Sequence, residues 1–285
     1  NTQLGALHMN VVFDSFAGRQ LMPGDIKSLN VDAIWFSPLY PSPNADYGYD
    51  ISDYMDIHPD YGNLEIFRKV LDEAHERGLR VFMDLVVNHT SDEHRWFIES
   101  RKSRDNPYHD YYYWRPARYV GKKRLPPNNW TSQFEGEAWE YDSDLDEYYL
   151  HLFARKQPDL NMDNPKVREE VKNIMRFWLD MGVDGFREDV ITYISKTPGL
   201  PSVYPKLPAA NGMQHYSNRP DVHRYLSEFR HDVLDNYDCF VVGESPLTNA
   251  DIALKYVTEG KDKVLDEMIA FSHMEADCFM TDFVP

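Results

Sequence analysis

Two short apolar runs, residues 32–36 and 80–87, lie in the first third of the chain, and neither alternates with polar positions. Continuous apolar runs are typical of strands that are covered on both faces of a parallel sheet. Between the runs, Asn63 predicts a helix N-cap and Gly78 predicts the end of the helix. The buried stripe of this helix is expected to consist of Leu64, Phe67, Leu71 and Ala74. The pattern predicts a β-α-β unit.

The same pattern resumes in the second half of the chain. The first predicted helix runs from Asn164 and Pro165 to Gly182 and is followed by a strand over 183–190. A second helix begins at Pro220 and is followed by a strand over 239–242. A third helix, capped by Thr248 with Asp251, runs to about Glu259 and leads to an apolar stretch over 268–271. Repeated βα units with short links predict an α/β fold, either a (β/α)8 TIM-type barrel or a doubly wound sheet. About six strands are expected in this chain.

A stretch rich in Tyr, Trp, Asn, Pro and charged residues interrupts this rhythm after residue 89, and it has no long helical pattern. We therefore expect three segments. Residues 1–89 would form the first part of the barrel, residues 90–163 an inserted subdomain of short strands and loops, and residues 164–285 the continuation of the barrel with strands four to six.

Composition narrows the classes of function. The chain has 30 Lys and Arg against 47 Asp and Glu, a net charge of −17, which repels a polyanion, so we expect no nucleic-acid partner. The chain has no run of 18 apolar residues, so no membrane span is predicted. The two cysteines, Cys239 and Cys278, are too few for a disulfide framework and favour a reducing compartment. We therefore expect a cytoplasmic protein, and the oligomeric state is left open.

Carboxylates dominate the polar residues at the predicted strand ends, where the active face of a parallel βα fold lies. The candidates are Asp84 with Asn88 and His89, Arg187 with Glu188 and Asp189, Gly243 with Glu244, and His273 with Asp277 beyond the last apolar stretch. The sequence has no nucleophilic-serine turn, no glycine-rich phosphate loop and no pair of histidines at metal-ligand spacing. We therefore expect carboxylate chemistry and no metal site.

Two carboxyl groups on neighbouring barrel strands about 5 Å apart suit a retaining glycosidase. Arg187 is expected to keep Asp189 ionised as a nucleophile, and the apolar residues before Glu244 are expected to raise its pKa and keep it protonated as the acid. An Asp beside an Arg at a strand end is also typical of a structural ion pair, so the residues by themselves leave both interpretations open.

Five ordered motifs resemble the α-amylase family of glycoside hydrolases (family thirteen), and within it the oligo-1,6-glucosidase and α-glucosidase branch. They are DYGYDISDY at residues 46–54, DLVVNHTS at 84–91, QPDLN at 157–161, GFREDV at 185–190 and VGE at 242–244. The resemblance runs over nearly the whole chain, from about residue 32 to about residue 277.

The resemblance implies roles for single residues. Asp189 matches the nucleophile, Glu244 the general acid/base and Arg187 the arginine that steadies the nucleophile. Asp46 matches a residue that binds the non-reducing end of the sugar, Tyr49 the ring on which that sugar stacks, and His89 a donor to a sugar hydroxyl. Three more residues match the pocket lining of the branch: Phe134, Phe153 and Gln157. Either phenylalanine could equally be a core residue.

Val190, directly after the proposed nucleophile, matches a specificity position of the branch. There Val accompanies acceptance of α-1,6 links, whereas Ala or Thr accompanies a preference for α-1,4 links. A β-branched residue also simply suits a buried strand.

The chain departs from the family pattern at both ends. It has no Asn-His-Asp motif of a seventh strand, no eighth-strand arginine and no C-terminal β-domain, so we expect a partial copy with low activity. Between Phe13 and Asp32 there is too little chain for the usual first loop with its calcium-type site. Residues 24–26 look like its remnant, so no cofactor is expected. Glu188 replaces a residue that is more often apolar in the family, and strand alternation points it away from the barrel lumen.

The resemblance and the residues together predict a retaining exo-α-glucosidase that hydrolyses terminal α-1,6 bonds, and also α-1,4 bonds, of short oligosaccharides. A transglycosylase or isomerase of the same family would use the same residues with a sugar as acceptor. A non-catalytic barrel scaffold, like the ectodomain of amino-acid transporter heavy chains, is a third alternative, although it predicts decay of a carboxylate pair that this chain retains.

Overall fold

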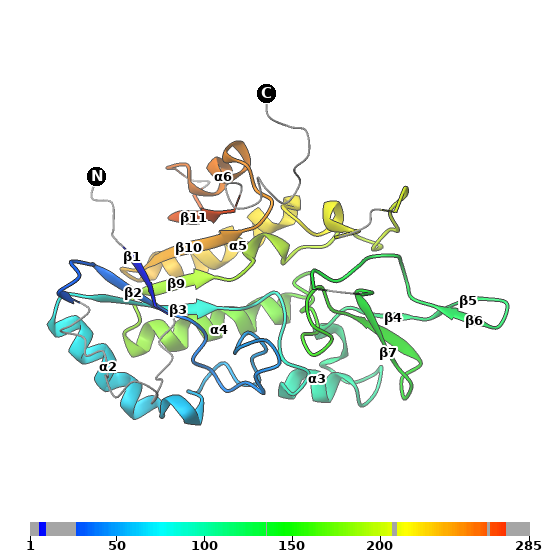
Figure 1. Ribbon diagram of the computed structural model, residues 1–285, viewed down its shortest axis with the longest axis horizontal. Coiled ribbons are helices and arrows are strands. Elements are labelled where there is room, and N and C mark those ends of the chain that lie inside the picture. Colours follow the sequence, from blue (N-terminus) through cyan, green and yellow to red (C-terminus); the bar gives the residue numbers. More distant parts are fainter. Residues whose placement is uncertain (1–5, 10–26, 135, 207–209, 261–262, 272–285) are drawn as a thin grey trace.

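The computed structural model describes residues 6–9, 27–134, 136–206, 210–260 and 263–271 (Figure 1). Its main sheet has six strands in the order β1-β2-β3-β9-β10-β11, and every pairing is parallel. The strands are β1 (Ala6–Met9), β2 (Ala33–Phe36), β3 (Arg80–Leu85), β9 (Gly185–Glu188), β10 (Phe240–Ser245) and β11 (Glu267–Ala270). Their spatial order follows the chain without reversal, whereas a doubly wound sheet reverses at a switch point. The barrel expectation is confirmed.

Among the described residues, the helices that precede β3, β9, β10 and β11 are α2 (Leu64–Glu76), α4 (Pro165–Met181), α5 (Pro220–Asp232) and α6 (Ala250–Val257). Two expected caps are confirmed, because the Asn63 side chain accepts from the backbone N–H of Ile66 and the Asn164 side chain accepts from that of Lys166. Gly182 ends α4 in the left-handed conformation, as a glycine C-cap does.

The expected cap of α6 is wrong. Asn249, not Thr248, accepts from a backbone N–H of the first turn, that of Ile252. The Thr248 hydroxyl is buried and instead accepts a hydrogen bond of 2.9 Å from the Asn218 side chain. The helix also ends earlier than expected, at Val257.

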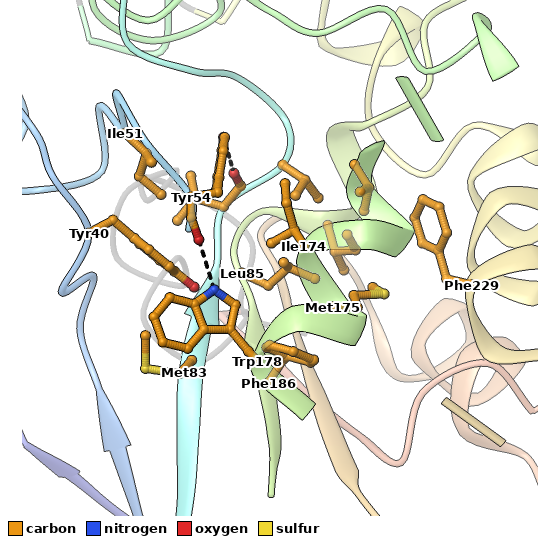
Figure 2. Close-up of a cluster of buried hydrophobic side chains, with 14 of the residues drawn as sticks. Tyr40, Ile51, Tyr54, Met83, Leu85, Ile174, Met175, Trp178, Phe186 and Phe229 are labelled. Atoms are coloured by element: carbon orange, nitrogen blue, oxygen red, sulfur yellow. Dashed lines mark hydrogen bonds between the residues drawn. The ribbon is translucent and has the colours of Figure 1, made fainter. Parts of the chain in front are cut away.

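The core lies between the sheet and the helices that cover its outer face (Figure 2). Met83 and Leu85 of β3, Phe186 of β9, and Ile174, Met175 and Trp178 of α4 form its centre. Two polar atoms inside this core have partners: Trp178 Nε1 donates to the Tyr54 carbonyl oxygen at 2.9 Å, and the Tyr40 hydroxyl donates to the Asp84 carbonyl oxygen at 2.8 Å. The second bond ties the core to the end of β3.

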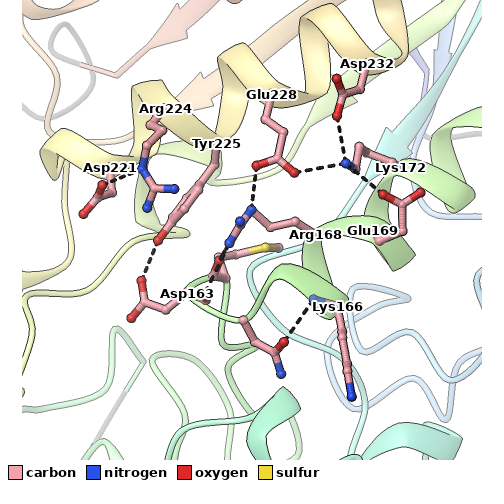
Figure 3. Close-up of polar contacts among 12 residues, drawn as sticks. Asp163, Lys166, Arg168, Glu169, Lys172, Asp221, Arg224, Tyr225, Glu228 and Asp232 are labelled. Atoms are coloured by element: carbon pink, nitrogen blue, oxygen red, sulfur yellow. Dashed lines mark hydrogen bonds and ion pairs between the residues drawn. The ribbon is translucent and has the colours of Figure 1, made fainter.

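Helices α4 and α5 are joined by an ion-pair network at their contact (Figure 3). Lys172 lies 3.0 Å from a Glu228 oxygen and 2.9 Å from an Asp232 oxygen, and Arg168 Nε lies 2.8 Å from the other Glu228 oxygen. Arg168 and Lys172 are both nearly buried, so each cation needs these partners. The network fixes the two helices against each other behind β9.

Short antiparallel strands follow β3, beyond the end to which its arrow points (Figure 1). Strands β4 (Trp114–Pro116), β8 (Glu147–Leu150) and β7 (Trp139–Asp142) form a three-stranded sheet in that order, and β5 (Arg118–Val120) pairs with β6 (Lys123–Leu125). A helix, α3 (Arg95–Ser100), precedes them. Short 3₁₀ turns complete the chain at Pro59–Tyr61, His109–Tyr111, Ile191–Tyr193, Met213–His215 and Leu234–Asn236.

A second buried cluster joins this antiparallel region to the barrel. Trp130, Trp139 and Leu152 from the antiparallel region pack in one cluster with Val190 and Tyr193, which follow β9. The region therefore rests on the loops at the carboxyl ends of the barrel strands, where it forms one wall of the space above them.

Candidate active site

The carboxyl ends of three neighbouring strands bring the charged candidates together. Asp84 on β3 is in register with Arg187 on β9, and Arg187 is in register with Val242, two residues before Glu244 on β10. Asp189 follows β9 directly, and its backbone N–H donates to the Leu85 carbonyl oxygen at 3.0 Å. His273 and Asp277, the candidates beyond the last strand, lie outside the described residues, as do residues 24–26.

Arg187 is the centre of this cluster. Its Nη1 lies 2.9 Å from Asp84 Oδ1 and 2.5 Å from Asp189 Oδ1, and its Nη2 lies 2.7 Å from Glu244 Oε1. The guanidinium carbon also lies 4.7 Å from the Trp35 ring centre and 5.7 Å from that of Tyr49, within cation–π range. One buried cation therefore holds three carboxylates at the floor of the site.

Asp84 is completely buried and supports the guanidinium from below. Its Oδ2 accepts hydrogen bonds of 3.2 Å each from Trp35 Nε1 and from the Tyr49 hydroxyl. Burial raises the pKa of Asp84 to about 6, although Arg187 acts in the opposite direction. Asp84 thus positions both Arg187 and Tyr49.

Asp189 and Glu244 share the Arg187 guanidinium, Asp189 through Nη1 and Glu244 through Nη2. Burial raises the pKa of Asp189 well above its ordinary value, Arg187 lowers it, and the neighbouring carboxylates of Glu244 and Asp84 raise it further. Burial and the neighbouring carboxylates thus favour the protonated form of Asp189, whereas Arg187 favours its ionised form.

The environment argument made from the sequence is wrong in two respects. Glu244 does not lie in an apolar setting, because it forms an ion pair with Arg187 and its Oε2 accepts from the Val190 N–H at 3.0 Å. Arg187 does not single out Asp189 either, since it contacts both carboxyl groups. These environments do not separate the roles of the two residues.

Asp46, Gln157 and His89 form a second polar group, brought together from three distant stretches of the chain. Gln157 Nε2 lies 2.9 Å from Asp46 Oδ2 and 3.1 Å from His89 Nε2. Burial raises the pKa of Asp46, and burial lowers that of His89 to about 4, so the imidazole is neutral at pH 7. The group offers both donors and acceptors, as recognition of a neutral hydroxylated ligand requires.

Aromatic rings form the wall beside this group. The Phe153 ring centre lies 5.1 Å from that of His89 and 5.6 Å from that of Phe134. Phe134 is 58% exposed, which excludes the interpretation of this residue as core. Phe153 is partly buried and packs against the second buried cluster. It therefore contributes both to that cluster and to the aromatic wall beside His89.

Val190 has a backbone conformation that the sequence does not predict. Its φ of 37° and ψ of 39° are left-handed, which is strained for a β-branched residue. The side chain is buried in the second cluster, and the N–H is the one that donates to Glu244. The sharp turn after β9 thus links the specificity candidate to the carboxylate pair.

Sequence reasoning missed the support below His89. Lys196 Nζ lies 2.7 Å from Asp159 Oδ2 and 2.9 Å from Asn88 Oδ1, and the side chains of Lys196 and Asp159 are both completely buried. Asn88 in turn contacts His89 Nδ1 at 3.2 Å. Asp159 lies within one of the five motifs. Lys196 belongs to none of them, so only the burial of Lys196 in the structure identifies it. The sequence likewise predicts Trp35 only as an apolar strand residue, whereas its Nε1 donates to Asp84.

In the part of the chain that the structure describes, no group of three His, Cys, Asp or Glu side chains could hold a metal ion. The helices of the described residues include none that is long and apolar enough to cross a membrane.

Comparison with known proteins agrees with this geometry. Residues 25–283 match the α-amylase family, catalytic domain. The chain is 54% identical over 254 residues to oligo-1,6-glucosidase of Parageobacillus thermoglucosidasius, which covers 88% of the chain and 44% of that protein.

Two solved structures have the same fold. Trehalose-6-phosphate hydrolase of Bacillus licheniformis superposes with a TM-score of 0.85 at 43% identity, over 90% of this chain and 44% of the other. Isomaltulose synthase of Erwinia rhapontici superposes with a TM-score of 0.82 at 41% identity, over 88% and 44%. The chain thus spans less than half the length of these relatives. It belongs to the α-amylase catalytic-domain family, and its six parallel strands are part of that family's TIM barrel.

Proposed function

We propose that the chain forms part of a retaining exo-α-glucosidase that hydrolyses terminal α-1,6 bonds, and also α-1,4 bonds, of short gluco-oligosaccharides. The observation that carries the proposal is the contact of both Asp189 and Glu244 with one guanidinium, at the carboxyl ends of adjacent parallel strands. Identity of 54% to an oligo-1,6-glucosidase supports the substrate class. The activity is proposed for the longer protein, since the chain covers 44% of that relative.

In the proposed reaction the carboxylate pair reacts in its singly protonated state. Asp189 attacks the anomeric carbon while Glu244 protonates the leaving oxygen, and Glu244 then removes a proton from the water that breaks the glycosyl–enzyme bond. Arg187 stabilises the ionised Asp189 through its Nη1, 2.5 Å away. The assignment of the two roles rests on the family resemblance of the motifs.

Asp46, Gln157 and His89 are proposed to bind the terminal sugar. Their hydrogen-bonded contact lines one side of the site with groups that pair with hydroxyls, and the exposed Phe134 ring lies at the edge of the wall beside them. Tyr49, held by Asp84, is proposed as the ring under that sugar. This arrangement favours removal of one terminal unit at a time.

Residues 90–163 are proposed as the inserted subdomain, residues 1–89 as the first part of the barrel and residues 164–285 as its continuation. The antiparallel strands β4–β8 all lie within the middle segment, which supports the division.

A cytoplasmic location is also proposed, on the basis of two cysteines in 285 residues. An oligosaccharide is the proposed partner, and a net charge of −17 disfavours nucleic acid.

The test joins this chain to the C-terminal remainder of the Parageobacillus relative and measures hydrolysis of isomaltose and maltose. We expect hydrolysis with retention of the α-anomer, detected by NMR, and a loss on the order of 10⁴-fold in Asp189→Asn. Asp238→Asn is the matched control, since Asp238 is 92% exposed in a surface pair with Arg80. A folded chimera that cleaves neither sugar would end the proposal.

Transfer to a second sugar is the alternative, and the likeness to an isomaltulose synthase favours its consideration. Water and a sugar hydroxyl compete for the same glycosyl–enzyme intermediate, so the carboxylate pair serves both. Chromatography of the products from a concentrated disaccharide distinguishes them: glucose alone indicates a hydrolase, and a new disaccharide or trisaccharide indicates a transferase.

A further inference from the structure

Two of the three guanidinium nitrogens of Arg187 are held by carboxylates, and the third is not. Nη1 and Nη2 contact the three carboxylates at the floor of the site. Nε is buried and has no hydrogen-bond partner among the described residues. The N–H donors of a guanidinium point in fixed directions, so its orientation decides which carboxylates it reaches. Contacts other than hydrogen bonds therefore contribute to this orientation.

Trp35 provides such a contact. The guanidinium carbon of Arg187 lies over the Trp35 ring, 4.7 Å from its centre, and Trp35 Nε1 donates to Asp84 Oδ2 at 3.2 Å. The indole thus contacts the cation with its face and the carboxylate with its edge. Tyr49 makes the same two kinds of contact, but its ring centre is farther from the guanidinium carbon, at 5.7 Å.

The strand register explains why these side chains meet. Trp35 on β2 is paired with Phe82 on β3. Asp84 lies two residues after Phe82, so the two side chains are on the same face of the sheet. Asp84 is in turn paired with Arg187 on β9. Trp35, Asp84 and Arg187 therefore share one face of three neighbouring strands.

Trp35 differs from its strand neighbours in its packing. Ile34 and Phe36, on either side of it, are buried members of the main core cluster. Trp35 is partly exposed and belongs to neither of the two buried clusters found among the described residues. Its contacts with Asp84 and Arg187, rather than core packing, thus set this tryptophan apart.

We propose that Trp35 is a positioning residue of the glucosidase site: its ring orients the Arg187 guanidinium, and its N–H holds the Asp84 carboxylate against that guanidinium. The inference rests on the proposed function. With Arg187 in this orientation, Nη1 reaches Asp189 and Nη2 reaches Glu244. Trp35 would act on both reacting carboxyl groups through Arg187, without touching either of them.

The ionisation of Asp84 links Trp35 to the pH dependence of activity. Burial raises the pKa of Asp84, Arg187 lowers it, Glu244 raises it and the Tyr49 hydroxyl lowers it. A hydrogen bond to the charged form of a carboxyl favours that form, so the Trp35 N–H acts in the same direction as the Tyr49 hydroxyl. Without the indole N–H, Asp84 takes up its proton at a higher pH, and Arg187 then loses one of its carboxylate partners.

The indole N–H resonance of Trp35 reports this hydrogen bond in the chain itself. In the chain labelled with ¹⁵N-tryptophan, the Trp35 signal is the one that Trp35→Phe removes. It should shift with pH as Asp84 takes up its proton, with a midpoint above the ordinary Asp pKa of about 4, and should not shift in Asp84→Asn. Three other indoles donate to uncharged oxygens and should not follow this titration: Trp130, Trp139 and Trp178. A Trp35 signal as constant as these three would overturn the proposal.

Kinetics of the chimera described above show whether the contact serves the reaction. Trp35→Phe keeps a ring beside Arg187 and removes the N–H. We expect kcat for isomaltose to fall about tenfold and its acid limb to move up by roughly one pH unit, with KM unchanged. Trp35→Leu removes the ring as well and should lower kcat about 100-fold. Trp114→Phe is the matched control and should alter neither kcat nor the pH profile, because Trp114 Nε1 has no hydrogen-bond partner among the described residues.

The outcomes separate the role of Trp35 from the function on which it rests. If Trp35→Phe leaves kcat and the pH profile of an active chimera unchanged, the positioning role is overturned while the glucosidase proposal stands. A rise in KM alone also overturns it, because Trp35 would then contact the substrate. If the unaltered chimera cleaves neither sugar, the proposed function fails and the role of Trp35 fails with it. A lower kcat with a shifted acid limb in Trp35→Phe, absent in Trp114→Phe, supports the role.

Discussion

Glu188 should destabilise the fold as the pH rises, and replacing it with glutamine should remove that effect. The side chain is 1% exposed on β9, and its Oε2 has no hydrogen-bond partner among the described residues. Arg230, the cation whose charge acts on it, already forms an ion pair of 3.1 Å with Asp266. Burial raises the pKa of Glu188 from 4.5 to about 8, with Arg230 lowering it and Asp266 raising it.

The sign and size of the effect follow from proton linkage. Below pH 4.5 the carboxyl is protonated in both the folded and the unfolded chain, so the stability that depends on its proton is fully present. Between pH 4.5 and about 8 the unfolded chain is ionised while the folded chain keeps its proton. The free energy of unfolding then falls by about 1.4 kcal/mol per pH unit. The loss is about 3 kcal/mol at pH 7 and levels off at about 5 kcal/mol above pH 8.

Urea denaturation followed by circular dichroism at pH 5, 6, 7 and 8 measures this loss. The stability advantage of Glu188→Gln over the unaltered chain should grow by about 4 kcal/mol from pH 5 to pH 8, because all other titrating groups are common to both chains. Glu267 on β11 is exposed, so Glu267→Gln is the control for the effect of replacing a carboxyl by an amide on the free energy of unfolding. If the curves for Glu188→Gln and the unaltered chain run parallel within about 0.5 kcal/mol, Glu188 titrates at the same pH in the folded and the unfolded chain, and the reasoning is wrong.

Three further predictions test the support of the site. Lys196→Met should lower the free energy of unfolding by about 3–5 kcal/mol, because it leaves the Asp159 carboxylate buried without its cation; an unchanged urea midpoint would contradict this. Gly185→Ala should prevent folding or severely destabilise the folded chain, since an added Cβ would lie 1.8 Å from the Phe240 carbonyl oxygen. In Gly199→Ala the added Cβ meets nothing within 4 Å, and the free energy of unfolding should fall by only about 1–2 kcal/mol. Equal urea midpoints for the two variants would refute the difference. Val190→Thr in the chimera should shift the isomaltose-to-maltose ratio of kcat/KM toward maltose by about 10–200-fold, and an unchanged ratio would remove Val190 as a specificity residue.

Local patterns in the sequence predict most of the elements correctly. The helix that begins after Asn63 and the one that begins at Pro165 start where their caps predict, because an asparagine side chain satisfies backbone N–H groups within its own turn. The strand ends at Asp84 and Glu244 were found for a similar reason, since polar residues after an apolar run mark the rim of a parallel sheet. Thr248 shows the limit of this reasoning: a tertiary partner, Asn218, engages its hydroxyl, so the neighbouring Asn249 becomes the cap.

The sequence by itself thus determined the succession of strands and helices along the chain, the starts of α2 and α4 and the carboxylates at the rim, because each depends on residues close together in the chain. Only the tertiary structure decided that one guanidinium, Arg187, holds both Asp189 and Glu244, and that Lys196 lies buried beneath His89. It also decided that Glu188 is buried with an oxygen that has no partner among the described residues. These properties depend on which distant side chains exclude water from a charge, and burial of that kind has no local pattern in the sequence.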